Sequence, residues 1–238
     1  MTELRPINSV NDIAQMIDIS AVQADSTDDK VKEVVQRARK YNCYLVTILP
    51  AQTLHAKSLL QGLPTPKLGG NVGFPSGGQT TSIKFQEARE LVKMGVDEID
   101  MVIDIAAHLS GRDEDVYNDI KAVVNASEEK PVKVIIECNY LNNQQILKAC
   151  DLIIKAGAAY VKTGTGWAPS GATPDNVELI KKHVGDQIKI KASGGIRKVD
   201  TLLDMYRRGA SRFGISVTSA TRILEAASGL KYPIQFGE

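Results

Sequence analysis

The sequence predicts an α/β protein, a (β/α)₈ TIM barrel in which eight parallel strands alternate with helices. Short apolar segments rich in β-branched residues alternate with longer amphipathic segments along the chain. The chain has 238 residues, close to the roughly 250 of a typical barrel. No linker, low-complexity stretch or charge run divides it, so we expect residues 1–238 to form a single domain.

The expected strands are eight short runs dominated by valine, isoleucine and leucine. They are Ala14–Ser20, Cys43–Leu49, Leu68–Phe74, Glu98–Asp104, Val132–Cys138, Ala159–Thr163, Ile188–Ser193 and Arg212–Ser216. Eight such runs separated by helices favour a closed barrel over an open doubly wound sheet. The segment Gln61–Lys67 is expected to be the most loop-like connection.

Helical periodicity marks several of the longer segments between these strands. They are Asp28–Lys40, Ser82–Met94, Val116–Ser127, Asn143–Ala156, Pro174–His183 and Val199–Arg208. Thr27 and Thr173 stand where helix-capping side chains belong. Gly95, Gly157 and Gly209 each separate a helix from the next strand, where a left-handed residue commonly ends a helix.

Composition excludes several classes of partner. Lys and Arg total 29 and Asp and Glu total 28, without a basic block, so we expect no binding to nucleic acid or to an anionic membrane surface. The chain has no apolar run of about 20 residues and no apolar core in residues 1–11, so we expect no membrane span, no signal peptide and a cytoplasmic location. Three cysteines and three histidines without ligand spacing lead us to expect no metal and no cofactor.

Polar and ionisable residues stand near the expected carboxyl ends of the strands, where barrel enzymes place their chemistry. A lysine in a strand ordinarily reaches solvent at a rim, so charge among these apolar runs needs an explanation. The positions are Asp18, Thr47, Gly73, Asp100, Glu137, Lys162, Lys191 and Ser216.

Two of these residues, Lys162 and Lys191, end neighbouring strands and are expected to be inward-facing neighbours. Adjacent strands lie about 4.8 Å apart, so each ammonium would disfavour protonation of the other, as would burial. A lysine with a lowered pKa is a neutral amine that can attack a carbonyl. Asp100, reaching into the same mouth, is a candidate to relay protons and to balance an iminium charge. Asp18 and Glu137 are candidates either for the site or for structural pairing with lysines.

Glycine-rich turns follow the last three expected strands. They are Gly164–Gly166, Gly194–Arg197 and Gly214–Ser216. Backbone N–H groups in such turns bind phosphate, and barrels often hold phosphate after strands seven and eight. We therefore expect a phosphorylated small-molecule substrate here, with Arg197 as a charged contact and Gly214 in the wall.

The sequence resembles the deoxyribose-phosphate aldolase family in an ordered series of motifs from about Ile17 to about Ser216. They are Gly73-Phe74-Pro75 with Gly77; Lys84 and Glu87; Asp97–Val102; Lys133–Glu137; Val161-Lys162-Thr163 with Thr165-Gly166; Gly171-Ala172-Thr173; Lys191–Arg197; and Gly214 with Ser216.

The resemblance implies a metal-independent class I aldolase on a TIM barrel. Such enzymes reversibly cleave 2-deoxy-D-ribose 5-phosphate to D-glyceraldehyde 3-phosphate and acetaldehyde. By motif match, Lys162 is the Schiff-base lysine, Lys191 lowers its pKa, and Asp100 takes part in the proton relay. The positions that match the phosphate site are Gly166, Gly194, Gly195, Arg197 and Ser216. Further contacts to substrate are expected from Asp18, Thr47, Glu137 and Thr165.

Some positions depart from the family pattern. Gly164 stands where serine is usual, and Trp167 where phenylalanine or lysine is common. The expected second strand ends in Ile48-Leu49-Pro50 rather than Val-Asn-Pro, and the chain ends in Phe236-Gly237-Glu238 where some members have a catalytic tyrosine.

Three alternatives stay open, the first of them because of Gly164 and Trp167. The chain could act on another aldehyde or sugar phosphate, could be an isomerase with a carboxylate base such as Glu137, or could bind a sugar phosphate without turnover. The sequence also leaves open whether it forms a homo-oligomer, a dimer or a tetramer.

Overall fold

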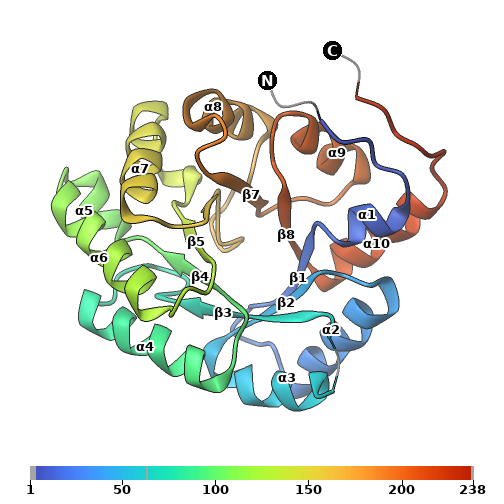
Figure 1. Ribbon diagram of the computed structural model, residues 1–238, viewed down its shortest axis with the longest axis horizontal. Helices are drawn as coiled ribbons and strands as arrows, with labels where there is room; N and C mark the ends of the chain where they lie inside the picture. The colour runs from blue at the N-terminus through green and yellow to red at the C-terminus, as the bar shows by residue number, and fades with distance from the viewer. Residues whose placement is uncertain (1–3, 63, 237–238) are drawn as a thin grey trace.

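A computed structural model describes residues 4–62 and 64–236 and confirms the (β/α)₈ fold. Eight strands form one closed barrel in chain order, with every neighbouring pair parallel (Figure 1). The strands are β1 (Ile17–Ala21), β2 (Leu45–Ile48), β3 (Lys67–Val72), β4 (Glu98–Val102), β5 (Val132–Ile135), β6 (Tyr160–Lys162), β7 (Lys189–Ser193) and β8 (Arg212–Ser216).

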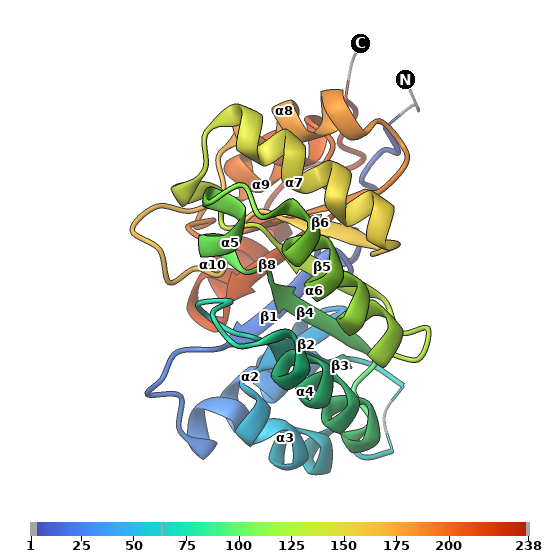
Figure 2. The ribbon, with the colours of Figure 1, turned by 90° about the vertical axis from the view of Figure 1, so that its left-hand side faces the viewer.

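Helices surround the barrel and cover the outer face of the strands (Figure 2). They are α1 (Val10–Ala14), α2 (Asp28–Tyr41), η1 (Pro50–Gln52), α3 (Thr53–Leu60), α4 (Thr81–Met94), α5 (Ile105–Leu109), α6 (Asp113–Ala126), η2 (Cys138–Tyr140), α7 (Asn143–Ala156), α8 (Pro174–Val184), α9 (Val199–Arg207) and α10 (Val217–Ser228). Within residues 4–62 and 64–236, no helix combines the length and apolarity that a bilayer span requires.

The expected capping residues are confirmed. Thr27 and Thr173 accept backbone N–H groups through their hydroxyl oxygens at the starts of α2 and α8. Gly95 and Gly157 end α4 and α7 with φ of 85° and 83°, and Gly209 follows α9 with φ of 113°. These turns return the chain to the bottom of the barrel for the next strand.

Several expected boundaries were wrong. Ala14 ends α1 rather than beginning a strand, and Asp104 caps α5 rather than ending one. Apolar residues such as Ile103 and Ile136 remain buried after their strands have ended, so a run of buried residues overstates strand length. The short helices α1, α3 and α5 and the C-terminal α10 had not been predicted. Leu63 in the expected loop, residues 1–3 and the terminal Gly237-Glu238 lie outside the described residues.

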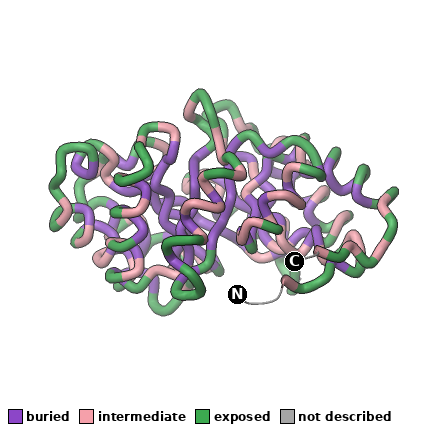
Figure 3. The backbone as a smooth tube through the Cα atoms, turned by 90° about the horizontal axis from the view of Figure 1, so that it is seen from above, coloured by how far each residue is buried: buried purple, intermediate pink, exposed green. Residues whose placement is uncertain are grey.

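The two faces of the barrel wall differ in chemistry. Outward-facing residues such as Val46, Ile99 and Val161 are fully buried against the helices in one apolar core. This buried zone runs through the middle of the molecule and is edged by exposed turns (Figure 3). The inward face is polar instead, and its charged side chains form the candidate site described next.

Candidate active site

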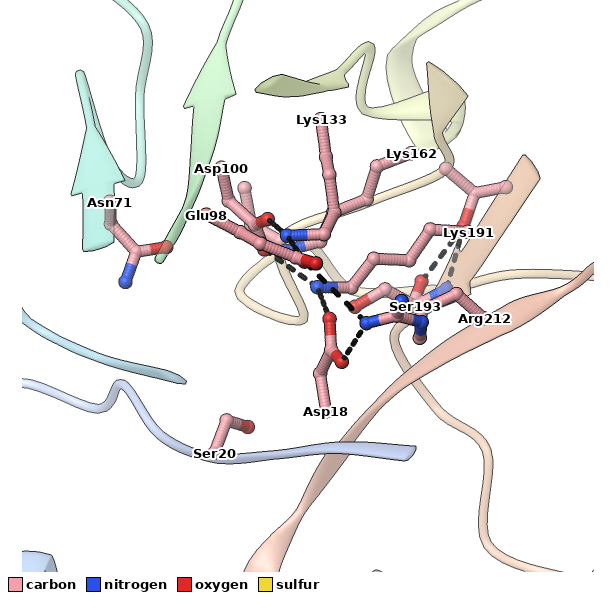
Figure 4. A network of polar contacts seen from close by, with 12 residues as sticks. Asp18, Ser20, Asn71, Glu98, Asp100, Lys133, Lys162, Lys191, Ser193 and Arg212 are labelled. Atoms are coloured by element: carbon pink, nitrogen blue, oxygen red, sulfur yellow. Dashed lines mark hydrogen bonds and ion pairs between the residues drawn. The ribbon is translucent and has the colours of Figure 1, made fainter. Parts of the chain in front are cut away.

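Lys162 and Lys191 are neighbours inside the barrel, as the sequence predicted. Lys162 ends β6 and is level with Lys191 on β7. Their Nζ atoms lie 2.7 and 2.8 Å from the same oxygen of Asp100, Oδ2. All three side chains are at least 94% buried, so the site is shielded from bulk water. The carboxylate of Asp100, on β4, binds both amines (Figure 4).

These residues belong to a larger set of buried ion pairs, which we call the interior charge network. Lys191 also lies 2.5 Å from Asp18, and Arg212 lies 2.9 Å from the other oxygen of Asp18. Lys133 bridges Glu98 at 2.6 Å and Asp100 at 3.0 Å. The network comprises Asp18, Glu98, Asp100, Lys133, Lys162, Lys191 and Arg212.

The pKa of Lys162 is lowered from 10.5 to about 8. Burial is the largest cause, because the ammonium loses its hydration. The positive charges of Lys191 and Lys133 lower the pKa further, whereas the carboxylate of Asp100 opposes both effects. Near neutral pH, Lys162 is therefore a neutral amine, the form that attacks carbonyl carbon, far more often than a lysine with an ordinary pKa of 10.5.

The two aspartates of the network are held as carboxylates. Burial alone would raise the pKa of Asp100, but Lys133, Lys162 and Lys191 together hold that pKa well below its usual value. Asp18 follows the same pattern, with a pKa lowered by Lys191, Lys133 and Arg212 against the effect of burial. Asp100 therefore stays ionised wherever Lys162 is neutral, as a counter-ion and a hydrogen-bond acceptor.

Asp18 lies deeper than the sequence suggested. It is the second residue of β1, level with Gly214 of β8, and does not end its strand as expected. Its two carboxylate oxygens form ion pairs with Lys191 and Arg212, and its side chain is fully buried. These contacts favour the structural alternative for Asp18, a carboxylate that pairs with Lys191 and Arg212.

Among the described residues, no lysine donates a hydrogen bond to Glu137. It follows β5 with a left-handed backbone, φ 52°, and accepts the backbone N–H of Thr165 at 3.1 Å and, through a short bond, the Thr165 hydroxyl. The Cβ of any side chain at Gly164 would lie 2.7 Å from a Glu137 oxygen. Glu137 therefore positions the loop after Lys162, and Gly164 leaves space for it.

Sequence reasoning missed several interior residues. Lys133 and Glu98 were seen only as parts of family motifs, and Arg212 only as the start of a strand. The alternation of side chains along a strand could have indicated Lys133, because it stands between Val132 and Val134, which are both buried in β5 and point to the opposite face. The pKa of Lys133 is raised because Asp100, Asp18 and Glu98 outweigh burial, so this lysine stays charged beneath Lys162.

A cavity of about 220 Å³ opens at the ends of β6, β7, β8 and β1, and its wall on β7 begins at Ser193, two residues beyond Lys191. Gly166, Gly194 and Gly195 in its wall have φ of 84°, 95° and 74°. The loops pack so tightly that a Cβ on Gly194 would lie 3.1 Å from the Cα of Gly171. The wall includes all six residues predicted to bind phosphate and also Thr165; they are Thr165, Gly166, Gly194, Gly195, Arg197, Gly214 and Ser216.

Residues 12–219 match the family model described as DeoC/LacD family aldolase. The chain belongs to this family. The deoxyribose-phosphate aldolase of Klebsiella pneumoniae subsp. pneumoniae is 41% identical over 227 residues, which cover 94% of this chain and 90% of the relative. That of Staphylococcus epidermidis is 40% identical over 203 residues, which cover 85% and 92%. The resemblance seen in the motifs is therefore confirmed.

Solved structures give the same result. A tetrameric deoxyribose phosphate aldolase from Aeropyrum pernix superposes with a TM-score of 0.85 and 29% identity, covering 94% of each chain. A structure described as QR15, an aldolase, has a TM-score of 0.85 and 35% identity, covering 90% of this chain and 95% of its own. The DeoC/LacD family aldolase fold thus extends over nearly the whole molecule.

In this DeoC/LacD family aldolase, Trp167 joins three loops at the mouth of the barrel. Its Nε1 donates to the carbonyl of Val22 after β1 at 2.9 Å. Its ring meets Phe74, after β3, edge to face at 6.3 Å between centroids. Its backbone N–H donates to the Thr165 hydroxyl. The departure from the family pattern at Trp167 therefore fixes the loop that carries Thr165 and Gly166.

The cysteines of this aldolase lie outside the network. Cys43, Cys138 and Cys150 are buried free thiols, and burial raises the pKa of Cys43 and of Cys150 to about 12. They therefore remain protonated and unreactive near neutral pH. Among residues 4–62 and 64–236, no group of three or more His, Cys, Asp or Glu side chains is arranged to hold a metal ion.

Proposed function

We propose that the protein is a class I aldolase that reversibly cleaves 2-deoxy-D-ribose 5-phosphate to D-glyceraldehyde 3-phosphate and acetaldehyde, with Lys162 as the Schiff-base residue. The observation that carries the proposal is the buried Lys162 amine, whose pKa is lowered to about 8 beside Lys191. The glycine-lined cavity, whose wall includes Thr165 and Gly166 from the loop after Lys162, and the names of the relatives support the substrate.

In the first step, neutral Lys162 attacks the aldehyde carbon C1 of the open-chain sugar. Loss of water gives an iminium, which replaces an uncharged amine with a cation. The Asp100 carboxylate, 2.7 Å from Nζ in the free protein, stabilises that charge. The iminium then accepts electrons from the bond between C2 and C3.

Cleavage requires that the C3 hydroxyl lose its proton. We assign this relay to Lys191 and Asp100, acting with a water molecule, because Lys191 Nζ and Asp100 Oδ2 lie 2.8 Å apart beside Lys162. As the proton leaves, C3 becomes the carbonyl of D-glyceraldehyde 3-phosphate and an enamine remains. Protonation at C2 and hydrolysis release acetaldehyde and restore the amine.

The phosphate binds in the 220 Å³ cavity. Gly166, Gly194 and Gly195 offer backbone N–H groups in left-handed turns, and α10 begins directly after its N-cap residue, Ser216. Exposed Arg197 adds a charged contact at the rim. Anchoring the phosphate here directs the aldehyde end towards Lys162.

An isomerase with Glu137 as base is less well supported. One oxygen of Glu137 already accepts two hydrogen bonds from Thr165, and the residue lies in a buried turn. A non-catalytic binding role would leave the buried lysine pair unexplained. Another sugar phosphate within the same chemistry remains compatible with Gly164 and Trp167.

Borohydride reduction with 2-deoxyribose 5-phosphate tests the imine. We expect one substrate-derived adduct, mapped by peptide mass spectrometry to Lys162. Lys162→Ala should abolish it, whereas Lys32→Ala, which removes an exposed lysine of α2, should leave trapping unchanged. Trapping that persists in Lys162→Ala, or an adduct on another lysine, would refute the nucleophile assignment.

Location and assembly belong to the same proposal. We expect a cytoplasmic homo-oligomer, and the tetramer of the Aeropyrum pernix relative supports assembly. Three buried thiols fit a reducing compartment. Sedimentation of the purified chain distinguishes a monomer, dimer and tetramer.

A further inference from the structure

Three uncharged polar residues line the barrel opposite the interior charge network. They are Ser20, Thr47 and Asn71, on β1, β2 and β3 (Figure 4 labels Ser20 and Asn71). Strand alternation places them on the inner face: Ser20 is two residues from inward-facing Asp18, Thr47 is level with Ser20, and Asn71 is level with Asp100. We call this group the polar crescent.

Two atoms of the polar crescent are buried without a partner. The Asn71 side chain is fully buried, and its Nδ2 donates to the carbonyl of Ile48 at 2.5 Å. Because a carbonyl only accepts, the free atom is the Asn71 acceptor Oδ1. Neither this atom nor Oγ1 of Thr47, which is 4% exposed, has a hydrogen-bond partner in the described chain. Buried polar groups are nearly always satisfied, so two unsatisfied ones on adjacent strands indicate a missing hydrogen-bonding group.

The polar crescent connects the two ends of the candidate site. At one end, Asn71 is level with Asp100, which binds Nζ of Lys162. At the other end, Thr47 is level with Ser20, which lines the phosphate cavity. A sugar phosphate that is covalently bound at Lys162 and anchored in the cavity would therefore face the polar crescent across the barrel interior.

We propose that Asn71 and Thr47 bind a hydroxyl on C2 of the aldehyde held by Lys162, so that the protein accepts 2-hydroxyaldehyde donors such as glycolaldehyde. This inference rests on the proposed imine. In the bound sugar, C1 is bonded to Nζ, the C3 oxygen meets Asp100 and Lys191, and C4 and C5 extend to the cavity. C2 adjoins the carbon bonded to Nζ, and the polar crescent supplies an acceptor and a hydroxyl for a hydroxyl group on C2, whereas the C4 hydroxyl lies further towards the cavity.

The reaction balances without a further reagent. Lys162 condenses with glycolaldehyde and releases water, and loss of a C2 proton from the iminium gives an enaminol. C2 then bonds to the carbonyl carbon of D-glyceraldehyde 3-phosphate, whose oxygen takes up a proton. Hydrolysis returns the amine and releases an aldopentose 5-phosphate.

The test compares acetaldehyde with glycolaldehyde as donors to D-glyceraldehyde 3-phosphate, with the products quantified by mass spectrometry. We expect the intact chain to use both. Asn71→Val and Thr47→Val should each lower the ratio of glycolaldehyde to acetaldehyde turnover by about tenfold, because each removes a hydrogen bond that only the hydroxylated donor makes. Thr47→Ser, which keeps the hydroxyl, should retain the ratio.

Thr53→Val is the matched control. Thr53 is also fully buried with an unpartnered hydroxyl oxygen, but it lies in α3 outside the barrel. It should leave the donor ratio unchanged. Equal ratios in Asn71→Val, Thr47→Val and the unaltered chain would show that the polar crescent holds only structural water and would overturn the inference.

If a variant fails to fold, the two donors can still be compared on the unaltered chain. Turnover of acetaldehyde without turnover or borohydride trapping of glycolaldehyde would overturn the donor inference and leave the aldolase proposal intact. Turnover of neither donor, with no adduct at Lys162, would refute both.

Discussion

At the residue scale, the reactivity of Lys162 depends on neighbours of opposite sign. Burial, Lys191 and Lys133 lower its pKa, and Asp100 raises it. Because the pKa is lowered overall, burial and the two neighbouring ammonium groups outweigh the carboxylate. Changing one neighbour at a time should therefore move the acid limb of the pH–rate profile in opposite directions.

Removing the neighbouring ammonium should move the acid limb to higher pH. In Lys191→Leu the pKa of Lys162 rises because a like charge is lost, so the neutral amine forms only at higher pH. We expect a shift of about one pH unit and a fall in kcat of about a hundredfold or more, since the proposed proton relay also uses Lys191. An acid limb of kcat/KM that stays in place would contradict this coupling. Lys191→Arg, which keeps the charge, is the control.

Removing the carboxylate should have the opposite effect on the acid limb. In Asp100→Asn the pKa of Lys162 falls below about 8, because the group that favours the ammonium is gone. We expect an acid limb at lower pH together with kcat reduced by about a hundredfold. A shift to higher pH would show that Asp100 does not stabilise the Lys162 ammonium.

At the element scale, the loop after β7 should determine phosphate affinity. Arg197→Ala removes the charged contact at the cavity rim, so KM for 2-deoxyribose 5-phosphate should rise by about tenfold, whereas turnover of unphosphorylated 2-deoxyribose should be unchanged. Steady-state kinetics with both sugars supplies the measurement and its internal control. Equal losses for both sugars would remove Arg197 from the phosphate site.

The elements predicted from the sequence are those with a distinct burial pattern, and the elements missed are those without one. The alternation of apolar and amphipathic segments predicted eight strands because each strand is buried, and the six residues predicted to bind phosphate line one cavity. Strand ends were misplaced where apolar residues continue into buried turns, as at Ile103. The short helix α3 was missed because its buried face begins with a polar residue, Thr53, whereas the apolar Leu54 is 60% exposed.

Within the site, sequence reasoning found the residues whose position depends on strand order alone. Lys162 and Lys191 end up level because their strands are consecutive. The pairing of Lys133 with both Glu98 and Asp100, and of Arg212 with Asp18, depends on how far each side chain reaches across the barrel. The unpartnered oxygen of Asn71 depends on every surrounding contact, so no local pattern could reveal it.

At the scale of the whole molecule, the interior charge network stabilises the fold only while it is complete. Lys133→Met should lower the free energy of unfolding by about 3–5 kcal/mol, because Glu98 and Asp100 would keep buried charges without this partner. Urea unfolding followed by circular dichroism measures the loss. The double variant Lys133→Met/Glu98→Gln should recover part of it, and no recovery would indicate a packing defect instead.

The interior charge network has a consequence for what the barrel can hold. While Lys162 is uncharged, three carboxylates face three cations, Lys133, Lys191 and Arg212, and the interior is electrically neutral. A neutral aldehyde enters this interior without upsetting the balance and becomes positive only once it is covalently attached. A ligand of the same shape that already carries an ammonium group would lose its hydration there and be repelled by Lys191 and Lys133, the same effects that lower the pKa of Lys162. The barrel thus discriminates between carbonyl compounds and amines by charge before any bond is made.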